Sequence, residues 1–214
     1  MKNLYKYFLI VVIVLISINC FSQEYIQISG DKLNEIMKKV EGVSSSINTL
    51  ECDFKEVKSI AVLEEEQISS GKMYYQKADK IRWEYLSPKS YMFIINKGQT
   101  VVKNGDKIDR GSGGAAMVFK RIGKLILGSI SGEKIVDDKR FNVSYFSNGK
   151  NLKIIMSPKD KRMMQMMGDL VFIFSLKDYY ILSIQMKNPS GDLTSITFEK
   201  KVINQPIGDN IFKL

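Results

Sequence analysis

Short segments in which every second residue is apolar are the feature that most limits what this chain can fold into. One such segment holds Ile81, Trp83 and Tyr85, and similar ones recur from residue 47 onward. Arg82, between Ile81 and Trp83, is expected to point to solvent on the opposite face of its strand. A period of two is typical of strands that bury one face. Turn signals such as Asn104-Gly105 and Asn148-Gly149 separate the segments. About ten short strands joined in this way predict an antiparallel sheet, curled into a barrel or a sandwich.

A helix is predicted before the first strand. Apolar residues recur there at i, i+3, i+4 and i+7, namely Leu33, Ile36, Met37 and Val40. Ser29 or Asp31 can cap the start of this helix, and Gly42 is expected to end it. Since one face is apolar and the other charged, the helix should lie against the sheet.

A second helical pattern interrupts the strands. Glycines at 111, 113 and 114 lead into Val118, Ile122, Leu125 and Ile126, which follow helical spacing. Glycines inside this helix weaken it by about 1 kcal/mol each relative to alanine. The pattern predicts an apolar, marginally stable helix inside a β protein.

Residues 1–22 have the layout of a cleaved signal peptide. Two lysines precede an apolar run over residues 8–16, and small residues follow. This run is too short to span a bilayer comfortably. We expect cleavage after Ser22, export to the periplasm, and one mature domain over residues 23–214.

Lipidation of Cys20 is the alternative processing route. It needs a small residue before the cysteine and usually an aliphatic residue three positions before it, where this chain has Asn19 and Ser17. Cleavage after Ser22 would leave Cys52 as the single cysteine, so no internal disulfide is expected. Cys52 most simply fills a small buried apolar position.

Composition excludes several kinds of chemistry. The 214 residues contain no histidine, which removes histidine acid–base catalysis and most zinc or iron sites. The aspartates at 106, 109, 137 and 138 lack the spacing of a calcium loop. We predict no catalytic residue, no metal site and no cofactor. The net charge of +9 suits an anionic membrane surface, an acidic partner or simple solubility, and we expect no nucleic-acid partner.

A cluster of methionines, Met163, Met164, Met166 and Met167, allows two interpretations. Such residues usually fill a core, which we favour, but they can also line a surface for flexible apolar guests. A similar choice concerns the sheet. A curved aromatic face covered by helices would form either an ordinary core or an apolar cavity, and a cavity without catalytic groups suits binding a lipid.

The order of several motifs resembles the periplasmic outer-membrane lipoprotein carrier family, LolA. After Phe54 the chain has, in order, Gly71, Lys77-Ala78, the strand IRWEY, Pro88, the turn residue Gly98, a helical insertion, and finally Asn204, Ile207 and Phe212. The resemblance covers nearly all of the chain after residue 22.

The resemblance implies a mainly β protein with helices (α+β), an unclosed antiparallel β-barrel of about ten to eleven strands. The N-terminal helix and the helical insertion would act as a lid. The lipid-binding cavity would be lined by Tyr75, Ile81, Trp83, Tyr85, Phe93, Ile95, Ile122, Leu125 and Ile126. Lys77 matches the family arginine that helps to hold the lid closed. Ala78 stands where the family has proline.

The implied function is that of a monomeric periplasmic chaperone. It would receive acylated lipoproteins from an inner-membrane ABC transporter and pass them to an outer-membrane acceptor. The same fold leaves three alternatives open: an outer-membrane-anchored receptor, a periplasmic lipid sensor, and an accessory protein for glycolipid or pigment export.

Overall fold

The computed structural model describes residues 24–62, 65–77, 79–110, 128 and 139–213. The expected signal peptide, Ala78 and nearly all of the expected helical insertion, including Ile122, Leu125 and Ile126, lie outside the described residues. The described residues form the sheet, the helix before it and most of the segments that join its strands.

One antiparallel sheet of twelve strands forms the body of the protein, in the order β1-β8-β9-β10-β11-β12-β2-β3-β4-β5-β6-β7. Short strands at the two edges, β1 and β7, explain why this number exceeds the ten or eleven expected. The strands are β1 (Ile26–Gln27), β2 (Thr49–Ile60), β3 (Glu65–Gln76), β4 (Lys80–Ser87), β5 (Tyr91–Asn96), β6 (Gln99–Asn104), β7 (Lys107–Asp109), β8 (Phe141–Ser147), β9 (Asn151–Pro158), β10 (Leu170–Ser175), β11 (Ile181–Lys187) and β12 (Leu193–Ile203).

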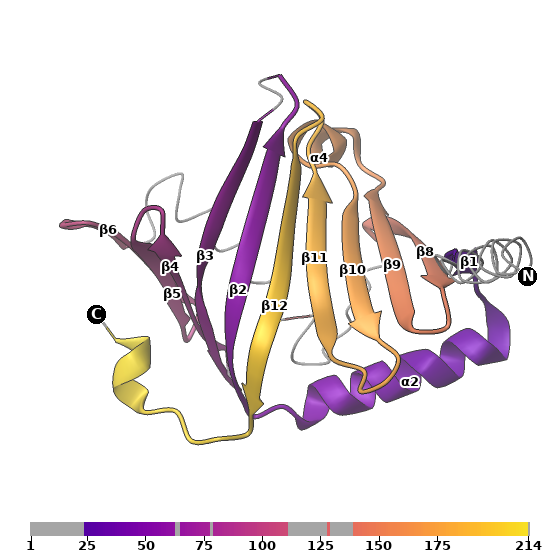
Figure 1. Ribbon diagram of the computed structural model, residues 1–214, viewed down its shortest axis with the longest axis horizontal. Coiled ribbons are helices and arrows are strands. Elements are labelled where there is room, and N and C mark those ends of the chain that lie inside the picture. The colour runs from indigo at the N-terminus through magenta and orange to yellow at the C-terminus, as the bar shows by residue number, and fades with distance from the viewer. Residues whose placement is uncertain (1–23, 63–64, 78, 111–127, 129–138, 214) are drawn as a thin grey trace, which may run out of the picture.

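The sheet is strongly curved but does not close. Figure 1 shows β4–β6 at a marked angle to β8–β12, as the accumulated twist of a long sheet requires. Among the described residues, β1 and β7 end the strand order and form no ladder with each other. This unclosed antiparallel barrel with accompanying helices confirms the predicted α+β fold.

Tight turns join the neighbouring strands where the sequence indicated them. Gly105 and Gly149 have φ values of +59° and +80°, a left-handed conformation that glycine adopts without strain. The alternation of side chains then sends one row of each strand to the concave face. On β9, for example, Leu152, Ile154 and Met156 are buried, while the residues between them are partly exposed.

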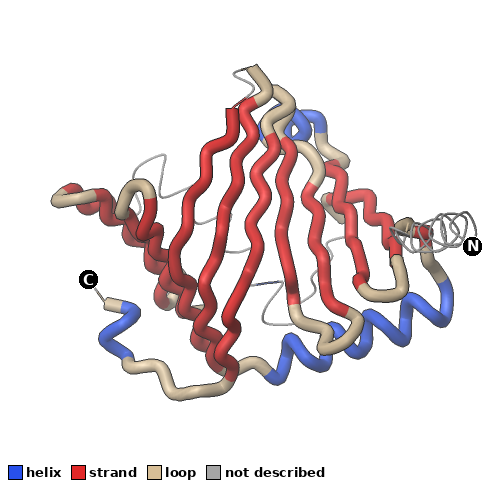
Figure 2. Tube along the Cα trace, in the orientation of Figure 1, coloured by secondary structure: helices blue, strands red, loops and turns tan. Residues whose placement is uncertain are grey.

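The helix α2 (Gly30–Ser46) lies across one end of the strands, as Figures 1 and 2 show. Its Ile36, Met37 and Val40 pack against the core, as the helical period predicted. The expected end at Gly42 was wrong, because the helix continues to Ser46. Gly42 is exposed, and a Cβ there would meet nothing within 4 Å, so this glycine costs the helix only about 1 kcal/mol in propensity.

The C-terminal residues cover part of the outer face of the sheet. After β12 the chain reaches the short 3-10 helix η2 (Asp209–Phe212), where Phe212 is buried, as is Ile94 on β5. On β4, Arg82 donates to the Ile211 carbonyl at 3.2 Å and pairs with Glu84 at 3.0 Å. The expectation that Arg82 points to solvent was therefore wrong, although it does lie on the face opposite Trp83.

Candidate functional site: the concave apolar face

The concave face of β3, β4 and β5 brings together the described residues of the predicted cavity. Cross-strand pairing places Tyr75 beside Ile81 and Ile81 beside Ile95, with Trp83 beside Phe93 one layer further along. The whole group is at most 6% exposed: Tyr75, Ile81, Trp83, Tyr85, Phe93 and Ile95. The structure shows that these side chains share one buried surface, and their contact with lipid remains a prediction.

Aromatic rings surround Trp83 on this surface. Its ring lies 4.3 Å from that of Phe54, stacks on Phe93 at 6.1 Å, and meets Phe198 edge-on at 6.1 Å. Gly71 lies opposite Phe54 across β2 and β3. A Cβ at Gly71 would stand 2.7 Å from the Phe54 ring and 1.9 Å from the Glu84 carbonyl oxygen, so only glycine fits between the β4 backbone and this ring.

The second half of the sheet supplies as much of the concave face as the first. The predicted cavity omitted these residues, although the alternation of their strands was a signal that could have found them. Leu170, Phe172 and Phe174 on β10 are buried, while Val171 and Ile173 on its other face are partly exposed. Further residues of the concave face are Leu152, Ile154, Met156, Ile184, Ile196 and Phe198.

A polar cluster borders the apolar surface. The Tyr85 hydroxyl donates to Glu56 Oε2 at 2.7 Å, and the Tyr91 ring stacks on Tyr85 at 4.2 Å. Burial, reinforced by the Glu56 charge, raises the pKa of Tyr85 far above its ordinary value, so the hydroxyl stays protonated and donating. Along β2 the buried apolar row ends at Phe54, and the next two positions of that row are Glu56 and Lys58.

Cys52 has the structural role that its sequence context indicated. It is 1% exposed, and burial raises the pKa of its thiol to about 12. A thiol in this state is unreactive at neutral pH. Nearby, burial lowers the pKa of Lys201, whose ammonium donates to the Phe198 carbonyl at 3.0 Å. Lys201 is the one lysine among the described residues whose pKa is clearly lowered, and burial is the main cause.

Lys77 lies at the C-terminus of α2. Its Nζ donates to the Ser45 carbonyl oxygen at 2.9 Å, a favourable position for a cation because the last carbonyls of a helix carry partial negative charge. The Asn204 side chain holds the same end of the helix, donating to the Ser46 carbonyl and accepting from the Asn48 amide. The contact ties Lys77 to the N-terminal helix, and its role as a latch remains a prediction.

The methionine cluster forms the helix α4 (Lys161–Met166), which Asp160 caps by accepting from the amides of Arg162 and Met163. Met163 and Met167 pack against the core, as the favoured interpretation required. Met164, however, is 46% exposed. The cluster therefore contributes both to the core and to the surface at the end of the sheet opposite α2 (Figure 1).

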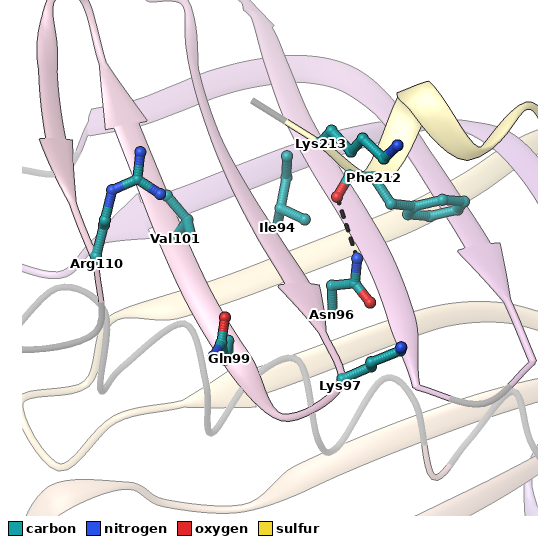
Figure 3. Close-up of a pocket in the computed structure, with 8 residues that line it drawn as sticks. All are labelled: Ile94, Asn96, Lys97, Gln99, Val101, Arg110, Phe212 and Lys213. Atoms are coloured by element: carbon teal, nitrogen blue, oxygen red, sulfur yellow. Dashed lines mark hydrogen bonds between the residues drawn. The ribbon is translucent and has the colours of Figure 1, made fainter.

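A separate pocket of about 350 Å³ lies on the outer face, between β5–β6 and the C-terminal residues (Figure 3). Ile94 and Val101 contribute its apolar part, and the cations Lys97, Arg110 and Lys213 also line it. Its side chains belong to the face opposite Trp83, so it is distinct from the concave surface.

Residues 45–214 match the family described as outer membrane lipoprotein carrier protein LolA. The chain belongs to this family. LolA-family members are typically carriers without catalytic activity, which agrees with the apolar character of the concave face. Among the described residues, no group of three histidine, cysteine, aspartate or glutamate side chains could hold a metal ion.

Solved structures share the fold at low sequence identity. The chain is 10% identical to an uncharacterized conserved protein of Thermus thermophilus, with a TM-score of 0.51 and coverage of 86% of this chain and 94% of the other. It is 11% identical to a chain of the MucA/MucB complex of Pseudomonas aeruginosa, with a TM-score of 0.50 and coverage of 86% and 61%. A LolA superfamily protein of Nitrosomonas europaea is 8% identical, with a TM-score of 0.45 and coverage of 85% and 97%.

No curated protein matches the chain. In the part of the chain that the structure describes, no helix has the length and apolar character needed to cross a bilayer.

Proposed function

We propose that this protein binds the acyl chains of lipoproteins on its concave face and carries them through the periplasm from the inner to the outer membrane. The observation that carries the proposal is the continuous row of aromatic and aliphatic side chains on one face of an unclosed sheet. A surface of this kind has few polar groups to orient a reaction, and it suits a flexible apolar ligand.

Burial of methylene groups supplies the driving force. Each buried methylene contributes about 0.8 kcal/mol, so about fourteen of them would contribute about 11 kcal/mol. Release would then be slow unless the surface is uncovered or an acceptor takes the chains directly. A barrel with unpaired edges can widen without breaking a closed ladder, which supports a role in transfer rather than in permanent storage.

The proposed partners are an inner-membrane ABC transporter that releases lipoproteins and an outer-membrane acceptor that receives them, with the carrier acting as a monomer. Support for these partners comes from family membership alone. The cationic pocket beside Arg110 and Lys213 offers a charged surface outside the lipid site, where an acidic protein face could dock without competing with cargo.

A second candidate is a regulator that recognises a protein partner, since a related fold occurs in the MucA/MucB complex. A third is an outer-membrane receptor, which would require lipidation of Cys20. Intact-mass analysis of the mature N-terminus separates the receptor from the soluble carrier, because an acylated Cys20 adds the mass of its fatty acids.

Purification from the native periplasm followed by mass spectrometry of the bound species tests the carrier function. We expect acylated lipoproteins to co-purify with the protein. A single free lipid class would favour a glycolipid or pigment accessory, and a protein partner bound without acyl chains would favour the regulator.

Matched variants connect this result to the concave face. Phe93→Glu places a carboxylate on the buried surface and should abolish acyl binding, because an unpaired buried charge repels apolar chains. Asn142→Glu adds the same charge at an exposed position on β8, away from both the concave face and the cationic pocket, and should bind normally. Phe93→Ser, which removes the ring without adding charge, covers the case in which Phe93→Glu does not fold. Normal binding by folded Phe93→Glu would contradict the proposed site.

A further inference from the structure

Trp83 combines deep burial with an unused hydrogen-bond donor. The residue is 1% exposed, and its indole Nε1 has no hydrogen-bond acceptor among the described residues. Buried donors in folded proteins nearly always have a partner, since a buried unpaired N–H loses its bonds to water and gains nothing in return. An unpaired indole N–H at the centre of the proposed binding face therefore points to an acceptor that arrives with the ligand.

Among the described residues, the surroundings of Trp83 offer no strong substitute for such an acceptor. Phe54, Phe93 and Phe198 surround its ring, with that of Tyr85 at 6.3 Å, and an aromatic face accepts an N–H only weakly. On the same face, the hydroxyl of Thr100 is also buried without a partner in the described part of the chain. The concave face therefore has two buried polar groups, on Trp83 and Thr100, without a hydrogen-bond partner among the described residues.

We propose that the indole N–H of Trp83 donates a hydrogen bond to the carbonyl oxygen of an ester- or amide-linked acyl chain. The inference rests on the proposed function and narrows its ligand class. The hydrocarbon part of a lipid has no acceptor, so the acceptor must come from the linkage that joins the chain to its carrier group. Trp83 then distinguishes acyl esters and amides from alkyl ethers and plain hydrocarbons of equal length.

This assignment also locates the linkage. The Tyr85 ring lies 6.3 Å from that of Trp83, and the bond from its hydroxyl to Glu56 marks the polar border of the concave face. A carbonyl that reaches Trp83 has passed this border, so the linkage is held inside the protein rather than left at the rim. Water would be excluded from the carbonyl there, which strengthens the hydrogen bond.

A matched pair of ligands tests the proposal. Monopalmitoylglycerol and its ether counterpart, hexadecylglycerol, have the same chain length and differ chiefly in the carbonyl. Calorimetric titration of both ligands gives an ester-to-ether affinity ratio for each variant. We expect Trp83→Phe, which keeps an aromatic ring and removes the N–H, to lower this ratio roughly tenfold. Ile95→Val, an apolar change on the same face, should leave the ratio within about twofold.

An unchanged ratio in folded Trp83→Phe would overturn the inference while leaving acyl binding intact. Binding of neither ligand by the unmodified protein would overturn the proposed function and the inference with it. The unmodified protein also provides a readout that needs no variant, because Trp83 is the only tryptophan of the chain. Hydrogen bonding of the indole should shift its fluorescence to longer wavelength with the ester and not with the ether, and equal shifts with both ligands would contradict the assignment.

Discussion

Replacing Gly71 with alanine should destabilise the protein severely, because the new methyl group has no space. Its Cβ would lie 1.9 Å from the Glu84 carbonyl oxygen and 2.7 Å from the Phe54 ring. To restore an ordinary contact of 3.4 Å to the carbonyl, β3 and β4 must separate by about 1.5 Å. Overpacking of this kind costs about 1–3 kcal/mol, and each ladder hydrogen bond lost beside it adds about 1 kcal/mol. We therefore expect a loss of about 3–5 kcal/mol in the free energy of unfolding.

Urea unfolding followed by the fluorescence of Trp83 measures this loss. Gly42→Ala is the matched control, because a Cβ there meets nothing within 4 Å and the residue lies within α2. The same chemical change should stabilise the protein at that position by about 1 kcal/mol. A Gly71→Ala protein within about 1 kcal/mol of the unmodified one would refute the reasoning.

A double variant separates the two obstacles. Phe54→Leu removes the ring atom near Gly71 but leaves the Glu84 carbonyl in place, so it should recover only a small part of the loss. Full recovery in Gly71→Ala/Phe54→Leu would show that the ring, and not the backbone of β4, is what excludes the methyl group.

Three further outcomes follow from single groups. Asn204→Ala should lower the free energy of unfolding by about 2–3 kcal/mol, since it removes the hydrogen bonds to Ser46 and Asn48 and leaves alanine at a φ of +57°. Asn204→Gly tolerates that φ and should recover about 1 kcal/mol in the same urea assay. Thr100→Val should raise the thermal midpoint, because it replaces a buried hydroxyl that has no hydrogen-bond partner among the described residues with a methyl group of similar shape, and a lowered midpoint would contradict this. The pKa of Cys52 is raised to about 12 from an ordinary value of 9.0. The stabilisation that the protonated thiol contributes is therefore complete below pH 9 and is lost as the pH rises toward 12. In Cys52→Ala the free energy of unfolding should decline less steeply over this pH interval.

The alternation of apolar residues determined the strands and their faces without help from the structure. Ile81, Trp83 and Tyr85 were predicted to share a face because side chains in a strand alternate by geometry alone. The turns at Gly105 and Gly149 were predictable for the same local reason, as their left-handed backbone suits glycine. The first helix was also predictable from its period, except for its end.

Contacts between distant segments decided the rest. The helix passes Gly42 and ends where Asn204 and Lys77 hold its last carbonyls, an interaction across 158 residues for Asn204 that no local pattern records. Arg82 lies on the predicted face but is covered by the C-terminal residues. Period-two patterning says which side of a strand is apolar and cannot say which segment packs against either side. That choice depends on tertiary packing. So do the exclusion of any side chain at Gly71 and the burial of the Trp83 N–H, which has no acceptor in the part of the chain that the structure describes.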